Sequence, residues 1–250
     1  MDVDTAHPLS SRAIGCTSLC TWCFRTRTAW EAWILDASAL APAEDSYAWS
    51  IDELDDTQVY TLLSAAVQPR PIAWVATLDS DGVRNLAPFS FFNVASRKPP
   101  TLMLSIGERI GFPGRPKDTL VNIRATGEFV VNIPSVANAA AVTASFATVE
   151  PHIDEFELAQ VTALPSRVVA PPSVAESLIS LECRLADLVE IGTDTVVFGT
   201  VVAATTRFGA VDDRLHADLS GGRWLSRLAG PYYSTTTPGA HQESTGWEPR

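Results

Sequence analysis

Residues 70–93, RPIAWVATLDSDGVRNLAPFSFFN, restrict the fold of this chain more than any other segment. Two apolar runs, Pro71–Leu78 and Val83–Phe92, flank the tetrapeptide DSDG, whose residues tolerate positive φ or hydrogen-bond their own backbone. Apolar runs on either side of such a turn are typical of a β-hairpin. The segment therefore predicts a pair of antiparallel strands.

The second of these runs is unusual for a central strand. Pro88 has no N–H to donate to a neighbouring strand, and proline in a sheet is confined to edges and bulges. Asn85 and Ser90 place polar groups beside Ala87 and Phe89. Two interpretations fit this pattern equally: an edge strand protected from aggregation, or a strand whose free polar groups bind a ligand.

The composition indicates a folded protein and narrows its partners. The chain has 250 residues, of which 46% are hydrophobic, enough for a sizeable core. A formal net charge of −11 disfavours general binding to the phosphates of nucleic acids. No apolar run approaches the roughly 20 residues that span a bilayer, and the N-terminus lacks the basic start and apolar core of a secretory signal. We expect a cytoplasmic protein that binds neither nucleic acid nor membrane.

Beyond the hairpin, the pattern predicts more strands than helices. Strands joined by turns, with few helices, favour an antiparallel barrel over a parallel βαβ sheet. No G-x-G-x-x-G follows a strand, which argues against a Rossmann nucleotide site. The expected elements are strands at Thr101–Ile106, Glu128–Ile133, Ile179–Ala186 and Thr195–Thr205, and helices at 29–41, at 118–127 and, behind a Ser135 cap, at Val136–Ala147.

The tripeptide Lys117-Asp118-Thr119 follows a glycine-rich loop and begins a short helix that ends at Gly127. A helix N-terminus with an ammonium and a hydroxyl group beside it is suited to an anion. Arg70 and Arg115 would add charge-assisted hydrogen bonds to a phosphate. The same residues also fit a plain surface helix, in which Asp118 is the N-cap and Lys117 is solvated.

Cysteine and histidine patterns give no clear site. Cys16, Cys20 and Cys23 have the spacing of the radical-SAM iron–sulfur signature, but no βα repeats follow them. We interpret them as residues of an N-terminal extension that binds no cluster. The four histidines have no metal-ligand spacing, His216 is interpreted as a solvated loop residue, and no G-x-S-x-G nucleophile motif occurs. We expect neither a metal site nor a catalytic side chain.

Five segments in the order RPIAWVAT, NLAPFSFFN, PPTLMLSI, KDTLVNI and GEFVVNI resemble the flavin reductase family, most closely its flavoredoxin-like members. The weaker matches are DEFELA, SLECRL and SRLAGPYY, and the resemblance covers about Trp49 to Ser234. It implies a mainly β fold, an antiparallel split β-barrel that binds FMN, with a few flanking α-helices. We therefore expect an N-terminal extension at 1–48, disordered or partly helical, the barrel at 49–234, and a disordered tail at 235–250.

The resemblance also implies where FMN binds. The Lys117–Thr119 segment would hold the phosphate, and the hairpin would line the isoalloxazine ring, with Trp74, Phe89 or Phe91 as an apolar wall. Ala76 departs from the family, which often has serine at this position. The expected cofactor-binding residues are Arg70, Val75, Ala76, Thr77, Asn85, Ala87, Pro88, Phe89, Ser90, Asn93, Ser105, Lys117, Asp118 and Thr119.

By the same resemblance, the protein is an NAD(P)H:flavin oxidoreductase and a homodimer. It would transfer a hydride from a nicotinamide to FMN and supply reduced flavin or electrons to a partner monooxygenase. Such a transfer between stacked rings needs no protein acid or base, which agrees with the lack of a catalytic motif. Two alternatives stay open: a non-catalytic FMN-binding electron carrier, and a split-barrel interaction protein that has lost flavin.

Overall fold

The computed structural model describes residues 47–220 and 223–236, which fall into two units divided between Leu54 and Asp55. In the first unit, the described residues contain a 3₁₀ turn, η2 (Ile51–Glu53), and the rings of Tyr47 and Trp49 stack with their centroids 6.0 Å apart. The expected helix at 29–41 and the three N-terminal cysteines lie outside the described residues.

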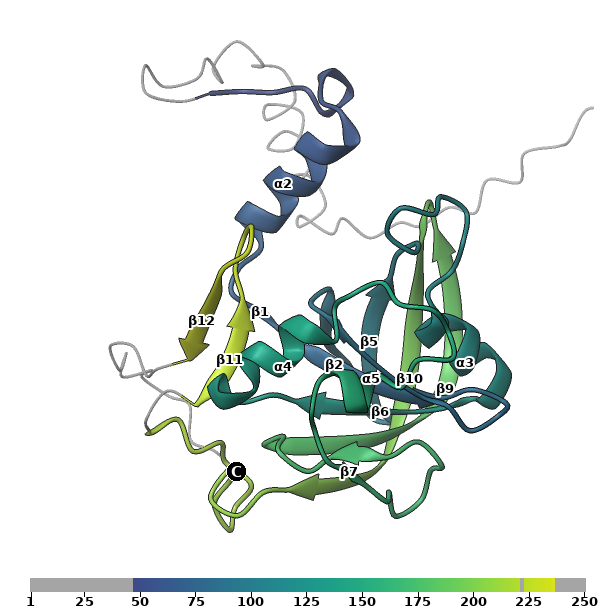
Figure 1. Ribbon diagram of the computed structural model, residues 1–250. Coiled ribbons are helices and arrows are strands. Elements are labelled where there is room, and N and C mark those ends of the chain that lie inside the picture. Colours follow the sequence, from purple (N-terminus) through teal and green to yellow (C-terminus); the bar gives the residue numbers. More distant parts are fainter. Residues whose placement is uncertain (1–46, 221–222, 237–250) are drawn as a thin grey trace, which may run out of the picture. The chain divides into compact units, whose positions relative to one another are not determined.

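The second unit is mainly β-sheet with short helices (Figure 1). No helix in the described ranges is long and apolar enough to cross a membrane. The helices are α2 (Asp56–Ala66), α3 (Asp118–Thr126), η3 (Val136–Asn138), α4 (Ala139–Ala144) and α5 (Glu155–Leu158). The strands are β1 (Arg70–Pro71), β2 (Ala73–Leu78), β3 (Arg84–Phe89), β4 (Phe92–Arg97), β5 (Pro100–Ile106), β6 (Glu128–Ile133), β7 (Ala163–Leu164), β8 (Ser173–Val174), β9 (Ile179–Ile191), β10 (Asp194–Thr206), β11 (Trp224–Arg227) and β12 (Tyr233–Thr236).

Seven strands form one antiparallel sheet in the order β3-β2-β6-β9-β10-β5-β4. The two edge strands, β3 and β4, are separated in the chain only by Ser90 and Phe91. So short a link can join opposite edges only if the sheet curls around on itself. The N–H of Ser105 on β5 donates to the carbonyl of Phe91 at this junction (2.8 Å). The expected mainly β fold with an antiparallel split barrel is confirmed.

The opening hairpin is confirmed, but its second strand is shorter than expected. β2 pairs with β3 from Ala73 opposite Phe89 to Leu78 opposite Arg84. Because β3 is an edge strand, Pro88 removes no hydrogen bond from the interior of the sheet. The strand expected to continue to Phe92 ends at Phe89, since the chain then crosses to the other edge and begins β4.

Alternate residues of β2 enter two different hydrophobic clusters, so this strand is buried on both faces. Val75 packs in the cluster that joins β5, β6, β9 and β10 to the apolar face of α3. Trp74 packs on the opposite face, in a cluster that includes Val142 of α4, Phe156 of α5 and Leu225 of β11. The small sheet β1-β11-β12 and the short helices therefore cover one face of β2 and β6.

The helix expected after Lys117 forms, with a different N-cap. α3 ends at Gly127, whose φ of 69° is the left-handed conformation that glycine favours. Asp118 was expected to be the N-cap, but the N-cap is Lys117, in extended backbone, and Asp118 is the first helical residue. The carboxylate of Asp118 instead accepts a hydrogen bond from Arg109.

Two further boundaries differ from the expectations. The helix expected at Val136–Ala147 is divided into η3 and α4 and ends at Ala144, although Ser135 forms a capping box as expected of a cap residue. β12 pairs with β11, so Ser234–Thr236, which we expected largely in a disordered tail, belong to a strand. Backbone pairing with β11 provides the order that their polar composition did not predict.

Candidate functional site

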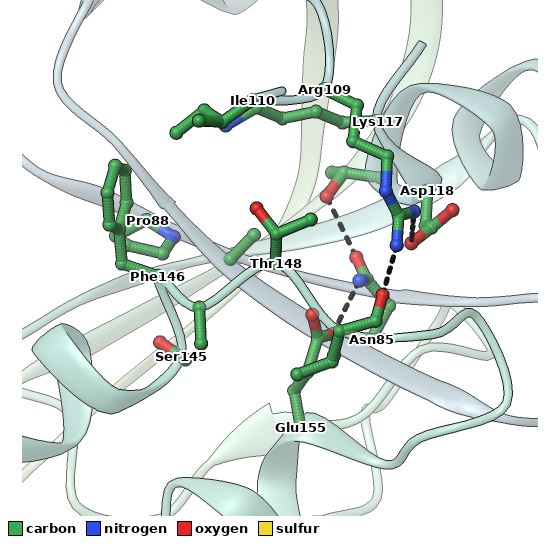
Figure 2. A pocket seen from close by; sticks show the side chains of 14 residues that line it. Asn85, Pro88, Arg109, Ile110, Lys117, Asp118, Ser145, Phe146, Thr148 and Glu155 are labelled. Carbon is green, nitrogen blue, oxygen red and sulfur yellow. Dashed lines mark hydrogen bonds and ion pairs between the residues drawn. The ribbon is translucent and has the colours of Figure 1, made fainter. Parts of the chain in front are cut away.

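A narrow pocket of about 40 Å³ lies where β3 meets the start of α3 (Figure 2). This volume suits a small group and not a fused ring system. Six of the expected cofactor-binding residues line it: Asn85, Ala87, Pro88, Lys117, Asp118 and Thr119. The other lining residues include Arg109, Ser145, Phe146, Thr148 and Glu155.

Asn85 connects the elements that surround this pocket. Its Oδ1 accepts hydrogen bonds from the hydroxyls of Thr77 (3.1 Å) and Thr119 (2.8 Å), and its Nδ2 donates to Glu155. Asn122 of α3 in turn donates to the Thr77 hydroxyl (3.0 Å). The Asn85 amide was expected to contact the cofactor, but most of its hydrogen-bonding capacity holds β3 to α3 and α5.

Glu155, the first residue of α5, is 5% exposed and lines the pocket. Its Oε2 accepts hydrogen bonds from the backbone N–H of Leu86 (2.7 Å) and from Asn85. The pKa of Glu155 is raised to about 7, mainly by burial and in part by the charges of Asp118 and Asp154, while the two hydrogen bonds oppose the rise. This carboxyl therefore changes its charge near neutral pH.

Lys117 lies between two aromatic rings at the entrance to α3. Its Nζ is 5.4 Å from the ring centroid of Phe89 and 5.6 Å from that of Phe146. Burial lowers the pKa of Lys117, while the charges of Asp194 and Glu155 raise it. A partly desolvated ammonium beside a helix N-terminus is a favourable partner for an anion.

The remaining charges at the pocket are largely paired. Arg109 donates to Asp118 (2.7 Å) and to the carbonyl of Val149. Outside the pocket lining, beside Glu155, Arg84 binds Asp154 through its Nε at 2.6 Å. Neither of these ion pairs includes Lys117 or Glu155. A ligand in the pocket would therefore interact most directly with the charges of these two side chains.

A wider cavity of about 320 Å³ adjoins the narrow pocket, with Pro88 and Phe146 lining both. This volume lies in the range of small-molecule sites, ~300–1,000 Å³. Its walls combine flat apolar groups with hydroxyls and one guanidinium, that of Arg227, which lies over the ring of Tyr233 (5.1 Å). The lining residues are Tyr60, Ile72, Pro88, Phe89, Ser90, Val142, Thr143, Phe146, Arg227, Pro231 and Tyr233.

Of the three aromatic residues suggested for an apolar wall, only Phe89 lines this cavity. Trp74 is fully buried in the core, and its Nε1 donates to the hydroxyl of Ser145 (2.8 Å). Phe91 lies outside the cavity near Tyr60, with ring centroids 6.2 Å apart. Phe146, which was not expected at the site, lines the cavity as well, together with Tyr60 and Tyr233.

Arg70 was expected near a phosphate, but its guanidinium is occupied by the protein. It donates to the carbonyls of Ser64 (2.6 Å), Val67 (2.7 Å) and Leu228 (3.1 Å), and to the hydroxyl of Ser90 (3.3 Å). It lines neither cavity. These bonds tie the end of α2 to the small sheet and to the chain that follows β3, so we assign Arg70 a structural role.

The other expected residues also lie outside the two cavities. Val75–Thr77 are fully buried because β2 runs behind the edge strand, and the methyl of Ala76 packs in an apolar cluster. The Ser105 hydroxyl donates to Asp194 (2.8 Å). Asn93 is exposed on β4, where its Oδ1 accepts from the next backbone N–H.

His216 lies in an exposed loop, pairs with Asp212 (3.3 Å) and lines neither cavity. In the described ranges, no group of three His, Cys, Asp or Glu side chains could hold a metal ion. The cysteines at 16, 20 and 23 lie outside those ranges.

Glu155 is the residue that the sequence interpretation missed. A glutamate in the first turn after an Asp N-cap is usually solvated, since acidic residues are common there. One signal was present, because the segment DEFELA was among the weaker matches to the family. Its contact with Asn85 spans 70 positions in the chain and depends on the fold.

Comparisons with known proteins agree with this architecture. The family model of the flavin reductase like domain matches residues 66–218. A protein of unassigned function from Aquifex aeolicus is 36% identical over 183 residues, which are 73% of this chain and 92% of that protein. The crystal structure of nitrilotriacetate monooxygenase component B from Bacillus cereus is similar with a TM-score of 0.75 at 29% identity, covering 80% of this chain and 100% of that one.

A further structure shares the fold alone. A Shewanella frigidimarina protein with a split barrel domain, provisionally assigned as a flavin reductase, has a TM-score of 0.69 at 20% identity and covers 80% of this chain and 100% of that one. The matched domain extends over more than half of the sequence and includes β3, α3 and α5, which contribute residues to the narrow pocket. This chain belongs to the flavin reductase-like family.

Proposed function

We propose that this protein binds FMN and acts as an NAD(P)H:flavin oxidoreductase. The observation that carries the proposal is the adjoining pair of cavities, which differ in size and chemistry and share Pro88 and Phe146. FMN has the same two parts, a compact anionic phosphate and a wide planar ring. The narrow pocket would receive the phosphate, and the wide cavity would receive the ring.

The residues present fit the phosphate end. Lys117 supplies a positive charge, and the first N–H groups of α3, a helix of nine residues, have no partners within the helix. The Thr119 hydroxyl lines the same pocket. The carboxylate of Asp118 would repel an anion in this pocket, but its ion pair with Arg109 reduces that repulsion.

The residues also fit the ring. Phe89 and Phe146 offer flat apolar surfaces, and Ser90 and Thr143, which carry hydroxyls, line the same cavity. A bound flavin supplies the hydride chemistry itself. The side chains of this chain would hold the ring in a fixed orientation and keep one of its faces accessible, which requires no protein acid or base.

We also propose that the protein is a homodimer. α2 has eleven residues, of which only Ser64 is buried, while Tyr60 (58%) and Leu63 (51%) are largely exposed. A helix of this length is marginal in water without packing, so an apolar partner surface would stabilise it. The similarity to a monooxygenase component supports a role in supplying reduced flavin to a partner monooxygenase.

The test is to purify the full chain, record its visible spectrum with added FMN, and follow NADH and NADPH consumption with FMN, FAD and riboflavin. We expect FMN binding and flavin-dependent consumption of at least one nucleotide. FMN binding without consumption of either nucleotide would favour the electron carrier. Failure to bind any flavin would exclude both activities.

A further inference from the structure

The unusual feature of the narrow pocket is a buried carboxyl where an anion is expected. Glu155 is only 5% exposed, and both of its hydrogen bonds from the described residues, those from Leu86 and Asn85, end on Oε2. Oε1 has no partner among those residues. Among the described residues, the only fully buried side-chain polar atom without a partner is Ser177 Oγ. Because Oε1 of Glu155 also has no partner among them, it cannot be fully buried, and we infer that it is accessible from the pocket that Glu155 lines. Figure 2 shows the Glu155 side chain directed toward Asn85, on the pocket wall.

The two forms of this carboxyl would treat an anion in opposite ways. The carboxylate repels it, because a second negative charge would enter a poorly solvated space. The acid keeps both hydrogen bonds on Oε2 and gains an O–H on Oε1 that can donate to the anion. The difference between repulsion and a donated hydrogen bond makes the protonated form the better receptor.

We propose that an anion enters the narrow pocket together with one proton, which Oε1 of Glu155 takes from solvent and donates as a hydrogen bond to the anion. This inference rests on the proposed function, in which the anion is the phosphate of FMN. Ligand affinity would then be coupled to pH through Glu155 by linkage.

The charges around Glu155 do not neutralise its carboxylate, so a proton is needed when an anion binds. Lys117 is the cation that would bind the anion, but the negative charge of Asp194 on β10 already offsets part of its positive charge. The charged groups of the elements around Glu155 are Arg84 of β3, Arg109 of the loop before α3, Lys117 and Asp118 at the start of α3, Asp154 at the N-cap of α5, and Glu157 of α5. Since Arg84 and Arg109 are paired with Asp154 and Asp118, the balance at the pocket depends on Lys117 and Glu155.

The pH range follows from the free carboxyl, whose pKa is raised to about 7 mainly by burial. Below this pH Glu155 is already protonated and the anion binds without proton uptake. Above it each binding event must also take up a proton, so affinity falls as pH rises. Binding limited to the protonated form predicts a Kd about tenfold higher at pH 8 than at pH 6.

The experiment is calorimetric titration of the full-length protein with FMN at pH 6, 7 and 8, for the wild type, Glu155→Gln and Glu157→Gln. The amide that Glu155→Gln introduces can donate to the anion at every pH, so we expect this variant to lose the roughly tenfold dependence. Glu157→Gln removes the same charge from the same helix at a side chain that is 80% exposed, and it should behave as the wild type. Titration of the FMN phosphate itself affects all three proteins equally.

Three results would overturn the inference. If Glu155→Gln keeps the wild-type pH dependence, Glu155 is not the proton acceptor. If the ¹³C carboxyl resonance of Glu155 in the wild type titrates at the same or a lower pH when FMN is bound, no proton is taken up there; we expect its midpoint to rise. If the wild type binds no FMN at any pH, both this inference and the proposed function fail, whereas the first two results leave FMN binding intact.

Discussion

Asn85 shows how one polar residue on an edge strand can organise a site without having to touch the ligand. Its amide connects Thr77 of β2, Thr119 of α3 and Glu155 of α5. All four side chains are buried. Removing the amide would leave two hydroxyls and a carboxyl with fewer partners in a poorly solvated space, and such groups are costly when unpaired.

Asn85→Ala should therefore lower the free energy of unfolding by about 2–4 kcal/mol, measured by urea denaturation. Asn93→Ala is the matched control, because Asn93 is exposed and bonds only the adjacent N–H; its effect should stay within about 0.5 kcal/mol. Equal effects of the two substitutions would contradict the structural role of Asn85.

At the scale of elements, the glycine at position 199 lets β10 pass close to the side chains of Phe129 and Cys183. A Cβ at Gly199 would collide with the ring of Phe129 and lie 3.2 Å from the Cβ of Cys183. Both neighbours belong to the core cluster on that side of the sheet, where little space is free to absorb a shift. The register shift between Phe198 and Gly199 lies at this same point.

Gly199→Ala should destabilise the protein by about 1–3 kcal/mol through overpacking, with a matching fall in the thermal midpoint. Thr205→Ala, at an exposed position of the same strand, tests the effect of alanine in β10 without a collision and should change stability by less than about 0.5 kcal/mol. A neutral Gly199→Ala would show that Phe129 can move aside.

Element prediction from the sequence succeeded where a strand alternates or a helix has a clear stop. β6 was predicted with its observed bounds, β5 began one residue earlier than expected, and Gly127 ended α3 as expected. β1 and β11 are two and four residues long, too short for periodicity to reveal. β4 was missed because the crossing at Ser90 is set by closure of the barrel and not by a local turn motif.

Prediction of the site also depended on whether the neighbours of a residue follow from a local sequence pattern or from tertiary packing. The helix start at Lys117–Thr119 and the polar edge strand were each visible as local patterns, and the family resemblance placed them together. Glu155 and Phe146 were not, because their neighbours are set by tertiary packing. The resemblance also included Arg70 and Ser105, whose polar groups bond protein partners and which line neither cavity.

At the scale of the whole molecule, the exposed apolar face of α2 is the surface where the dimer is proposed to form. Tyr60 and Leu63 are spaced as one face of α2 and are 58% and 51% exposed, and Val67, the C-cap of the helix, is 61% exposed. Leu63→Glu should shift the protein from dimer to monomer in sedimentation velocity. Ala65→Glu, on the opposite face, should not; a wild-type monomer, or equal effects of both changes, would contradict the proposed dimer.

One ligand is proposed to span both cavities, with its phosphate at Lys117 and its ring beside Phe89 and Phe146. The most direct measurement compares the affinities of FMN and riboflavin, which share the ring, for the wild type, Lys117→Met and the exposed control Lys98→Met. The wild type and Lys98→Met should prefer FMN. Lys117→Met should weaken FMN binding by about 10- to 100-fold, as loss of a charge-assisted bond implies, and leave riboflavin binding unchanged. An equal loss for both ligands, or no loss for either, would contradict a phosphate site at Lys117.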